Sequence, residues 1–277
     1  NGTAVMLLAV ILMSSKRPSI SRLLDEKLFY SMTILNITQC CIETVGFILD
    51  GNTAYGNHAV LIVLNTALFI NCIVFAYLWI LYADYKLFGD MRRIKHIYPL
   101  WAIPAIVVIL GCIINLVTPV FFVIDKFNVY QRTNLYIIPF AVTYFYLAYG
   151  VLLIYMNRKK VQKYLFMPAI LFMIPIIIGS LLQFFFYGYS LIWLGVAIGM
   201  VSLFINVQNE AAYVDALSGL FSRHYLESLL LMSIRKEEIA GTLAGIMLDI
   251  NGFKKVNDEF GHNVGDDAIA SVGKLLY

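Results

Sequence analysis

Long apolar stretches follow one another along the first three quarters of this chain. An α-helix needs roughly 20 consecutive apolar residues to cross the hydrocarbon core of a membrane. Seven stretches qualify as candidate spans, although the first is short: 2–13, 28–49, 58–83, 97–118, 135–156, 164–187 and 190–207. Because lipid cannot satisfy backbone N–H and C=O groups, these stretches predict helices, even where prolines interrupt them.

The composition agrees with an integral membrane protein. Only 13% of the residues are charged, whereas soluble domains carry about 25%. The charge is also segregated, because residues 208–277 hold 6 Lys/Arg and 10 Asp/Glu. We therefore expect an all-α seven-helix membrane bundle at residues 1–206, followed by a more polar segment at 207–277. The small net charge of +3 gives no reason to expect a nucleic-acid partner.

Basic residues predict the orientation in the membrane. The connections after spans one, three and five hold twelve Lys/Arg, whereas those after spans two, four and six hold only Lys126 and Arg132. The twelve are Lys16, Arg17, Arg22, Lys27, Lys86, Arg92, Arg93, Lys95, Arg158, Lys159, Lys160 and Lys163. Since cytoplasmic loops are enriched in Lys and Arg, we expect a multi-pass protein of the cytoplasmic membrane, in contact with its lipid. Its N-terminus lies outside and its C-terminus in the cytoplasm.

Chemically suggestive residues gather near the C-terminus. Thr242–Ile250 contains a short apolar run that predicts a buried strand, and Asp249 stands near its end, where α/β folds place ligands. Gly252 allows a close backbone approach to a phosphate, and Lys254 supplies a positive charge. We expect helices at about 222–240, capped by Ser222, at 252–260 and at 266–276.

Three segments carry a family resemblance. Residues 215–223 (DALSGLFSR) are similar to the D-x-L-T-G-L-x-N-R pattern that opens the diguanylate cyclase (GGDEF) domain. Residues 249–258 (DINGFKKVND) and 261–266 (GHNVGD) resemble its later D-x-D-x-F-K-x-x-N-D and G-H-x-x-G-D patterns. The resemblance covers about 208–277. It implies the N-terminal part of an α/β ferredoxin-like, nucleotidyl cyclase-type domain, joined to the membrane part by a linker helix.

The chain departs from the family pattern at several positions. Serines replace a threonine and an asparagine in the first segment, and Asn251 replaces the second aspartate of the next. The Gly-Gly-Asp/Glu-Glu-Phe signature, expected further on, does not occur before Tyr277, and the chain starts at Asn1. We therefore expect a fragment that lacks the complete active site and is inactive by itself.

The resemblance implies a magnesium and phosphate site. Asp249, with the backbone carbonyl of Ile250, would hold Mg²⁺, and the backbone of Phe253 with Lys254 would hold the GTP phosphates. Mg²⁺ prefers carboxylate and phosphate oxygens, and the metal and lysine would stabilise charge on phosphoryl oxygens. A turn role for Asp249 and a solvated helix face for Lys254 are the structural alternatives.

The resemblance also implies a guanine site. Asn257 and Asp266 would read the guanine edge, since they offer matching donor and acceptor groups. Helices opening near Gly252 and Gly265 would direct free N–H groups at anions. The alternatives are a helix-end residue for Asn257 and a helix N-cap for Asp266. In the family, two such domains meet as a homodimer, and each 3′-hydroxyl attacks the α-phosphate of the other GTP, so that cyclic di-GMP forms.

Several functions stay open at this point. The leading interpretation is a membrane-bound signalling protein whose cytoplasmic domain condenses two GTP molecules into cyclic di-GMP under control of a transmembrane sensor. A degenerate GGDEF receptor, which binds GTP or cyclic di-GMP without catalysis, is the main alternative. A transporter would leave the C-terminal motifs unexplained, and Asn257 with Asp266 argues against a cyclase that uses ATP.

Seven spans before a cyclase domain also resemble the seven-transmembrane sensor module of some bacterial histidine kinases and cyclases. Glu43 is the one acidic residue well inside a predicted span, which makes it a functional candidate. Other polar or aromatic residues fall at similar predicted depth: Asn65, Asn115, Tyr144, Gln183 and Trp193. We expect some of them to line an outward-open pocket for a small polar or cationic extracellular ligand, with interhelical hydrogen bonding as the alternative.

The connection between the two parts predicts a continuous helix. Residues 204–214 contain neither proline nor glycine and are mostly helix-forming. A continuous helix suits signalling by rotation or piston motion.

Overall fold

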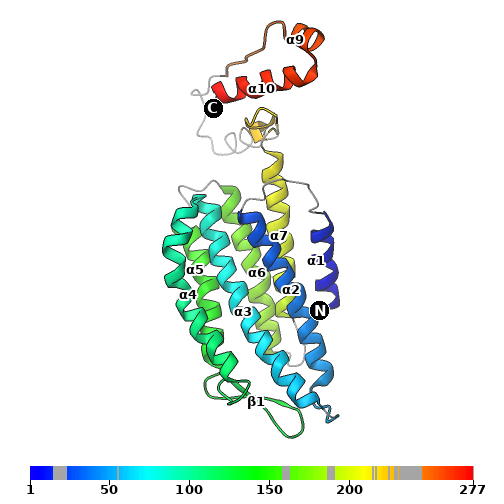
Figure 1. The fold of residues 1–277 in the computed structure, drawn as a ribbon, viewed down its shortest axis with the longest axis vertical. Helices are drawn as coiled ribbons and strands as arrows, with labels where there is room; N and C mark the ends of the chain where they lie inside the picture. Colours follow the sequence, from blue (N-terminus) through cyan, green and yellow to red (C-terminus); the bar gives the residue numbers. More distant parts are fainter. Residues whose placement is uncertain are drawn as a thin grey trace. The chain divides into compact units, whose positions relative to one another are not determined.

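The computed structural model describes residues 1–14, 24–54, 56–157, 163–185, 191–213, 215, 217–223, 225–227, 230 and 245–276. The chain forms two compact units, Asn1–Phe204 and Ile205–Tyr277. The first unit is a bundle of helices (Figure 1). The predicted division into functional domains at residue 206 stays a prediction.

Helices occupy most of the described part of the first unit. Their bounds are α1 Gly2–Ser14, α2 Leu24–Leu49, α3 Asn57–Phe88, α4 Met91–Ile114, α5 Ile137–Met156, α6 Lys163–Phe185 and α7 Ile192–Ala212. Within the described residues, α2, α3, α4 and α5 are long and apolar enough to cross a membrane, while α1 and segments 171–182 and 192–205 are shorter apolar helices. The membrane part of the prediction is therefore supported for four spans, and the count of seven spans stays a prediction.

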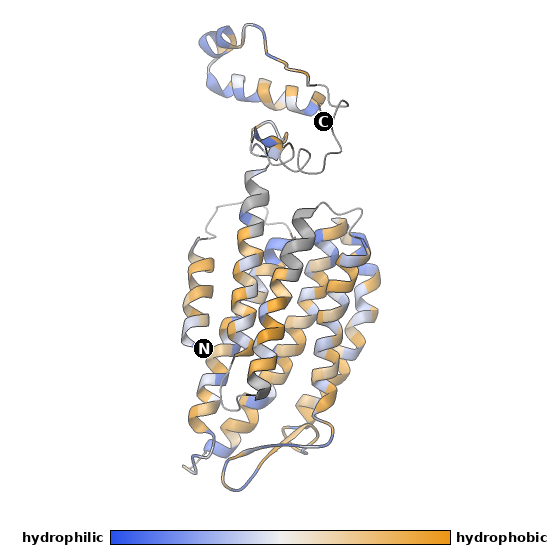
Figure 2. Cartoon of the chain, turned by 180° about the vertical axis from the view of Figure 1, so that it is seen from behind, coloured by the Kyte–Doolittle hydropathy of each residue, from blue (hydrophilic) through white to orange (hydrophobic). Residues whose placement is uncertain are grey.

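The outer surface of the bundle is apolar. Figure 2 shows hydrophobic residues along most of the length of its helices. On α4, Leu100 is 71% exposed and Val107 is 61% exposed. Large apolar patches of this kind are rare on soluble monomers, so the surface agrees with a lipid environment.

The connection between α3 and α4 is shorter than predicted. Gly89 ends α3 with φ 61°, and the Asp90 side chain accepts a hydrogen bond from the backbone N–H of Arg92 (2.8 Å), which caps the start of α4. The loop predicted between these two spans was therefore too long, because the Asp90 cap starts α4 before its apolar stretch begins. Three of the basic residues assigned to this loop lie on the first turns of α4: Arg92, Arg93 and Lys95.

A neighbouring helix bridges the turn of α4 next to Pro104. Pro104 has no N–H to donate to the Leu100 carbonyl, and its ring also disturbs the adjacent turn of the helix. The Tyr146 hydroxyl, from α5, donates to the Trp101 carbonyl (2.6 Å) and accepts from the Ala105 N–H (3.1 Å). Such re-satisfaction by neighbours allows proline within a membrane helix.

Glycines bring α6 and α7 together. Gly195 of α7 lies against the backbone of Pro175, and Gly199, four residues further on, lies against the backbone of Phe172. A side chain at either position would collide with α6. Small residues at this spacing are a common means of close helix packing in membranes.

A short antiparallel hairpin joins α4 to α5. Strand β1 (Phe122–Ile124) pairs with β2 (Tyr130–Arg132). Asn115 supports its start, because its Oδ1 accepts from the backbone N–H groups of residues 120, 121 and 122 at 2.7–3.2 Å. The sequence interpretation did not anticipate this hairpin, and it placed Asn115 and the residues after it inside a membrane span.

The second unit contains the C-terminal motifs. Helix α9 spans Phe253–Phe260 and α10 spans His262–Leu276, with Gly261 between them. The expected helix at 252–260 is confirmed. The expected start near Gly265 was wrong, because the Gly265 N–H already bonds to the Gly261 carbonyl (3.2 Å) within the first turn of α10.

The predicted strand at 242–250 does not form over its described residues. Residues 245–250 have no regular structure, and Met247 is 97% exposed. A strand exists only through hydrogen bonds to a neighbour, and the described residues of this unit provide none. The ferredoxin-like sheet stays a prediction. Of the expected helix at 222–240, the described part shows the capping bond from Tyr225 N–H to Ser222 Oγ (3.4 Å), and most of the remainder lies outside the described residues.

Candidate functional site

The first family-like segment forms a compact turn. Oδ1 of Asp215 accepts hydrogen bonds from the Ser218 backbone N–H (2.8 Å) and from the Ser218 hydroxyl (2.7 Å). These bonds hold the pKa of the Asp215 carboxyl below its usual value. The backbone of Ser218 also lies against Gly273 of α10, where no side chain could fit. The turn is therefore packed onto the last helix of the same unit.

The second segment places Asp249 and Lys254 around the start of α9. Gly252 adopts φ 72°, the left-handed conformation that favours glycine, and α9 begins at the next residue. Asp249 and Lys254 are both exposed. The Ile250 carbonyl accepts only a long hydrogen bond, from the Phe253 N–H at 3.4 Å. A carboxylate, a carbonyl and a lysine therefore flank one helix N-terminus, which favours anionic groups.

The third segment meets the second through Gly265. This glycine is buried, and a Cβ atom there would run into the Asn257 carboxamide and approach the Phe253 ring (3.4 Å). Asn257 on α9 is thus held against the residue that precedes Asp266 on α10. The structure brings the two expected guanine-reading residues onto adjoining helices. Asp266 is exposed and lies inside α10, so the N-cap alternative for it was wrong.

The donor set fits a magnesium ion that relies largely on nucleotide phosphates. No group of three or more His, Cys, Asp or Glu residues gathers among the described residues, and Asp249 directly precedes Ile250 in the chain. Mg²⁺ is commonly bound by one or two carboxylates together with substrate phosphates. The described residues agree with that mode.

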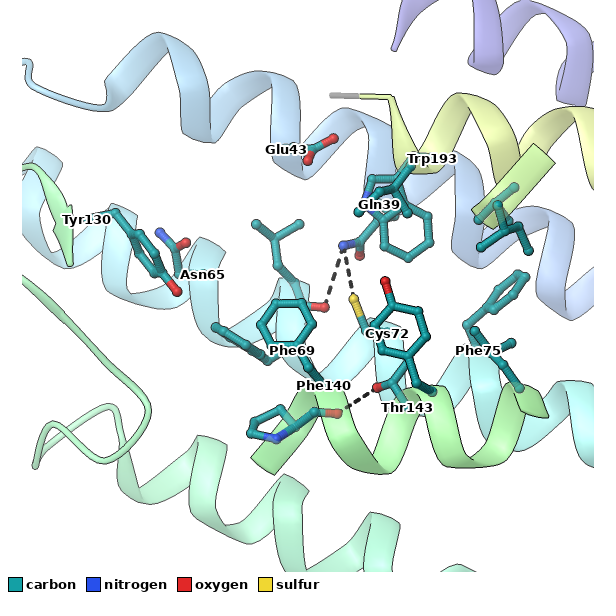
Figure 3. Close-up of a pocket in the computed structure, with 17 residues that line it drawn as sticks. Gln39, Glu43, Asn65, Phe69, Cys72, Phe75, Tyr130, Phe140, Thr143 and Trp193 are labelled. Atoms are coloured by element: carbon teal, nitrogen blue, oxygen red, sulfur yellow. Dashed lines mark hydrogen bonds between the residues drawn. The ribbon is translucent and has the colours of Figure 1, made fainter. Parts of the chain in front are cut away.

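A cavity of about 200 Å³ lies within the first unit, towards the hairpin end of the helices (Figure 3). Four residues of the expected pocket line it: Glu43, Asn65, Tyr144 and Trp193. They come from α2, α3, α5 and α7, as Figure 1 shows for the helices. The remaining lining is largely apolar and aromatic. This cavity gives the sensor hypothesis a physical location.

Two residues of the expected pocket do not contribute to this cavity as described. Asn115 is 5% exposed and bonds to the hairpin backbone, so its role is structural. Asn115 is therefore not among the candidates that line this cavity, because its Oδ1 accepts from three backbone N–H groups. Gln183 belongs to α6, and its side chain lies outside what the structure describes.

Gln39 was missed by the sequence interpretation. It lines the cavity on the same helix as Glu43. Its Nε2 donates to the Leu68 carbonyl (3.5 Å) and to Cys72 Sγ (3.6 Å), and its Oε1 accepts from Asn71 Nδ2 (2.7 Å). The spacing from Glu43, one helical turn, could have indicated it. Gln39 connects the cavity wall to the buried interface between α2 and α3.

Asp84 was also missed. It is fully buried on α3, and its two oxygens accept from Arg93 Nε of α4 at 3.1 and 2.9 Å. The Arg93 guanidinium lies over the Phe88 ring, 4.3 Å from its centroid. Lys86 pairs with Asp25 at 3.1 Å, which joins α3 to the first turn of α2. These ion pairs tie three helices together at the end of the bundle opposite the hairpin.

Comparison with known proteins identifies the C-terminal region. The family described as diguanylate cyclase, GGDEF domain, matches residues 212–277. Diguanylate cyclase DgcS of Shewanella oneidensis is 38% identical over 66 residues, which are 24% of this chain and 22% of that protein. Response regulator PleD of Caulobacter vibrioides is 36% identical over 61 residues (22% of this chain, 13% of that protein). Diguanylate cyclase DosC of Escherichia coli is 32% identical over 76 residues (27% and 16%).

The chain thus spans less than a quarter of the length of each of these relatives. No solved structure matches the chain. The predicted resemblance to the GGDEF domain is confirmed for residues 212–277, and the apolar helices before it are consistent with a membrane sensor module.

Proposed function

We propose that this chain, whose residues 212–277 form part of a GGDEF domain, belongs to a membrane-bound protein that condenses two GTP molecules into cyclic di-GMP. The observation that carries the proposal is the packing of Asn257 against Gly265, which holds both expected guanine-reading residues on adjoining helices. Asn257 and Asp266 together supply the donors and acceptors that a guanine edge requires. Adenine presents a different pattern, so GTP is the expected substrate.

The phosphates of GTP would lie at the start of α9. Its first backbone N–H groups, beginning at Phe253, attract negative charge. Lys254 adds a full positive charge on the same turn. Asp249 and the Ile250 carbonyl would hold Mg²⁺ together with these phosphates. When bound, the ion would neutralise charge on the phosphoryl oxygens.

The reaction requires two copies of the domain. A 3′-hydroxyl of one GTP attacks the α-phosphate of the other, the bond to the β-phosphate breaks, and pyrophosphate leaves. The same exchange in the opposite direction closes the cyclic dinucleotide. We therefore infer a homodimer in the active state. At low protein density, the initial rate should rise with about the square of the protein concentration, whereas a strictly proportional rise would argue against a dimerising species.

The membrane unit would place this domain in the cytoplasm, where GTP is found. The proposal rests on the excess of Lys and Arg in the connections remote from the hairpin. Lys126, exposed at the turn between β1 and β2, offers a test. A cysteine introduced there, Lys126→Cys, should react with a membrane-impermeant maleimide in intact cells. Labelling only after the cells are opened would reverse the proposed orientation.

The activity can be tested on the protein that carries this chain, purified in bilayer nanodiscs with GTP and Mg²⁺. Asp249→Ala should reduce formation of cyclic di-GMP by about a hundredfold or more, the scale seen when a group that stabilises transition-state charge is removed. Asp258→Ala is the matched control, because Asp258 is an exposed acid on α9 that has no proposed role. It should retain activity.

The same assay distinguishes the cyclase from the main alternative, a receptor that binds nucleotide without converting it. Such a receptor would also be compatible with Asp249 as a single carboxylate and with Asn251 in place of an aspartate. Tight GTP or cyclic di-GMP binding with no product in the unaltered protein would establish the receptor and reject the cyclase.

A further inference from the structure

The cavity in the membrane unit is lined mostly by apolar and aromatic side chains, together with one carboxylate, Glu43. Most of its surface is apolar, and aromatic rings from α3, α5, α7 and the hairpin line it, including Phe69, Phe75, Tyr130, Phe140 and Trp193 (Figure 3). Tyr144 of α5 also lines it. Its volume of about 200 Å³ lies below the roughly 300 Å³ at which drug-sized ligand pockets begin. The space therefore suits a small molecule with an apolar body.

Glu43 gives the cavity one negative charge. No lysine, arginine or histidine is among the residues that line it, and the other lining side chains are neutral at pH 7. Glu43 Oε2 accepts a hydrogen bond from the Asn1 side-chain amide at 3.1 Å, so a donor group does reach this carboxylate. A carboxylate in apolar surroundings favours a cation and repels an anion.

Three other polar side chains of the wall already donate to the helices. Asn65 Nδ2 donates to the Leu61 carbonyl (2.9 Å), and Thr143 donates to the Pro139 carbonyl (2.8 Å). The Gln39 amide donates to Leu68 and Cys72. What these three side chains can still present to a ligand is mainly oxygen acceptors. They therefore favour a ligand that donates hydrogen bonds.

We propose that this cavity binds a small amphipathic amine, with its protonated nitrogen at Glu43 and its apolar or aromatic body among the rings. Cations are also attracted by the faces of aromatic rings, so Trp193 and Tyr130 add to the preference. The inference rests on the sensor hypothesis for the membrane unit and on the proposed cyclase function of the protein. It replaces the broader expectation of a polar ligand, because most of the wall is apolar.

The ligand would touch two structural junctions. Tyr130 belongs to the hairpin, and its ring stacks on Phe122 (5.7 Å), which stacks on Phe69 (5.7 Å). The backbone N–H of Tyr130 donates to Asp50 Oδ1 (3.1 Å), next to the end of α2. On the other side, Gln39 bonds to Asn71 across the buried interface of α2 and α3. A ligand in the cavity would therefore contact residues that hold both the hairpin and the interface between α2 and α3.

The test compares three probes that share one apolar body. They are 2-phenylethylamine (cationic), 2-phenylethanol (neutral) and 3-phenylpropionate (anionic). Binding to the protein that carries this chain is measured by equilibrium dialysis in phosphatidylcholine nanodiscs, with empty nanodiscs subtracted. The amine should bind about tenfold more tightly than the alcohol, as expected for a hydrogen bond to a charged group, and the propionate should bind least.

Two variants on α2 test whether Glu43 causes the preference for the amine over the alcohol. Glu43→Gln should bring the amine and the alcohol to within about threefold of each other, whereas Glu26→Gln should preserve the difference. Glu26 is the matched control, because it undergoes the same charge change in the first turn of α2 and does not line the cavity. Should Glu43→Gln fail to fold, Glu43→Asp, which keeps the charge, is expected to retain the amine preference.

Three results would overturn the inference: equal binding of the amine and the alcohol, an amine preference that persists in Glu43→Gln, or no binding of any probe. The comparison of probes in the unaltered protein decides the ligand class even without a variant. The readout is also independent of the cyclase. Selective amine binding that leaves cyclic di-GMP synthesis unchanged would refute sensor control and keep the ligand class.

Discussion

Gly265→Ala should separate the stability of the C-terminal unit from its affinity for GTP. Gly265 lies inside α10, where alanine is favoured over glycine by about 0.5–1 kcal/mol. The new methyl group, however, would occupy the position of the Asn257 carboxamide. The Asn257 side chain must rotate away, and it is the group proposed to read guanine. The variant should therefore be slightly more stable and yet bind GTP less well.

The size of the loss can be worked out from the hydrogen bonds of one carboxamide. Each is worth about 0.5–1.5 kcal/mol net, so that losing two weakens binding by about 1–3 kcal/mol. At 1.4 kcal/mol for each tenfold change, this is about 5- to 150-fold. Fluorescent GTP binding to the protein that carries this chain measures it, and thermal unfolding of the same samples reports stability. The affinity for ATP should change much less.

A double-mutant cycle with Asn257→Ala is the control. If Gly265→Ala acts only through Asn257, the double variant should bind GTP no worse than Asn257→Ala alone, since the two losses share one cause. Losses that simply add would show that the methyl group acts elsewhere. Unchanged GTP affinity in Gly265→Ala would refute the assignment of Asn257 to guanine.

Three further variants test other parts of the structure. Arg93→Ala leaves the buried Asp84 carboxylate without its charged partner and should cost about 3–5 kcal/mol, so that the thermal midpoint in detergent falls. Arg92→Ala, exposed on the same turn, should leave the midpoint unchanged. Asn115→Ala removes the acceptor shared by the N–H groups of residues 120–122 and should cost about 1–3 kcal/mol locally, so that hydrogen exchange accelerates there and not in α5. Ser218→Ala removes the hydroxyl donor to Asp215 and keeps the Ser218 backbone N–H donor, so it should raise the lowered pKa of Asp215 part of the way towards its usual value in an NMR titration. Because that pKa is depressed in the folded protein, the associated stability is present above the unfolded value and is lost as the pH falls through the folded value; an unshifted titration in the variant would refute the assigned cause.

Hydropathy predicted the positions of the apolar helices well but not their ends. The run of apolar residues marks where a helix can lie in lipid, whereas capping by Asp90 begins α4 ahead of that run. The buried Asp84 was overlooked for the same reason, since it stood at the edge of the predicted span. Its ion pair joins two different helices, and a single sequence does not show which charges meet.

The hairpin and Asn115 show a second limit. Strands of three residues have too little pattern to be recognised from periodicity. They form here because the Asn115 side chain and the Asp50 carboxylate satisfy backbone N–H groups of this segment. Because Asn115 bonds to these backbone groups, it does not line the cavity. Asn115 thus shows that a polar residue inside a predicted span can serve its own backbone neighbours instead of a ligand site.

The C-terminal motifs behaved differently. Their order along the chain predicted the family, and the glycine of the third motif accommodates the asparagine of the second. That contact depends on how α9 packs against α10, so spacing alone could not reveal it. The expected strand at 242–250 does not form over its described residues, 245–250. An apolar run predicts burial, but a strand also needs a hydrogen-bonded neighbouring strand.

We propose that the membrane unit controls the proposed cyclase through α7, which continues without a break from Ile192 to Ala212. The most direct test is the initial rate of cyclic di-GMP synthesis in native membranes for two insertions after Gln208. Two extra helical residues rotate the C-terminal domain about the helix axis by about 200°. Seven extra residues return it to within about 20° of its original orientation. We expect the two-residue insertion to change the rate severalfold and the seven-residue insertion to preserve it. Equal rates in both insertions and in the unaltered protein would contradict control through this helix.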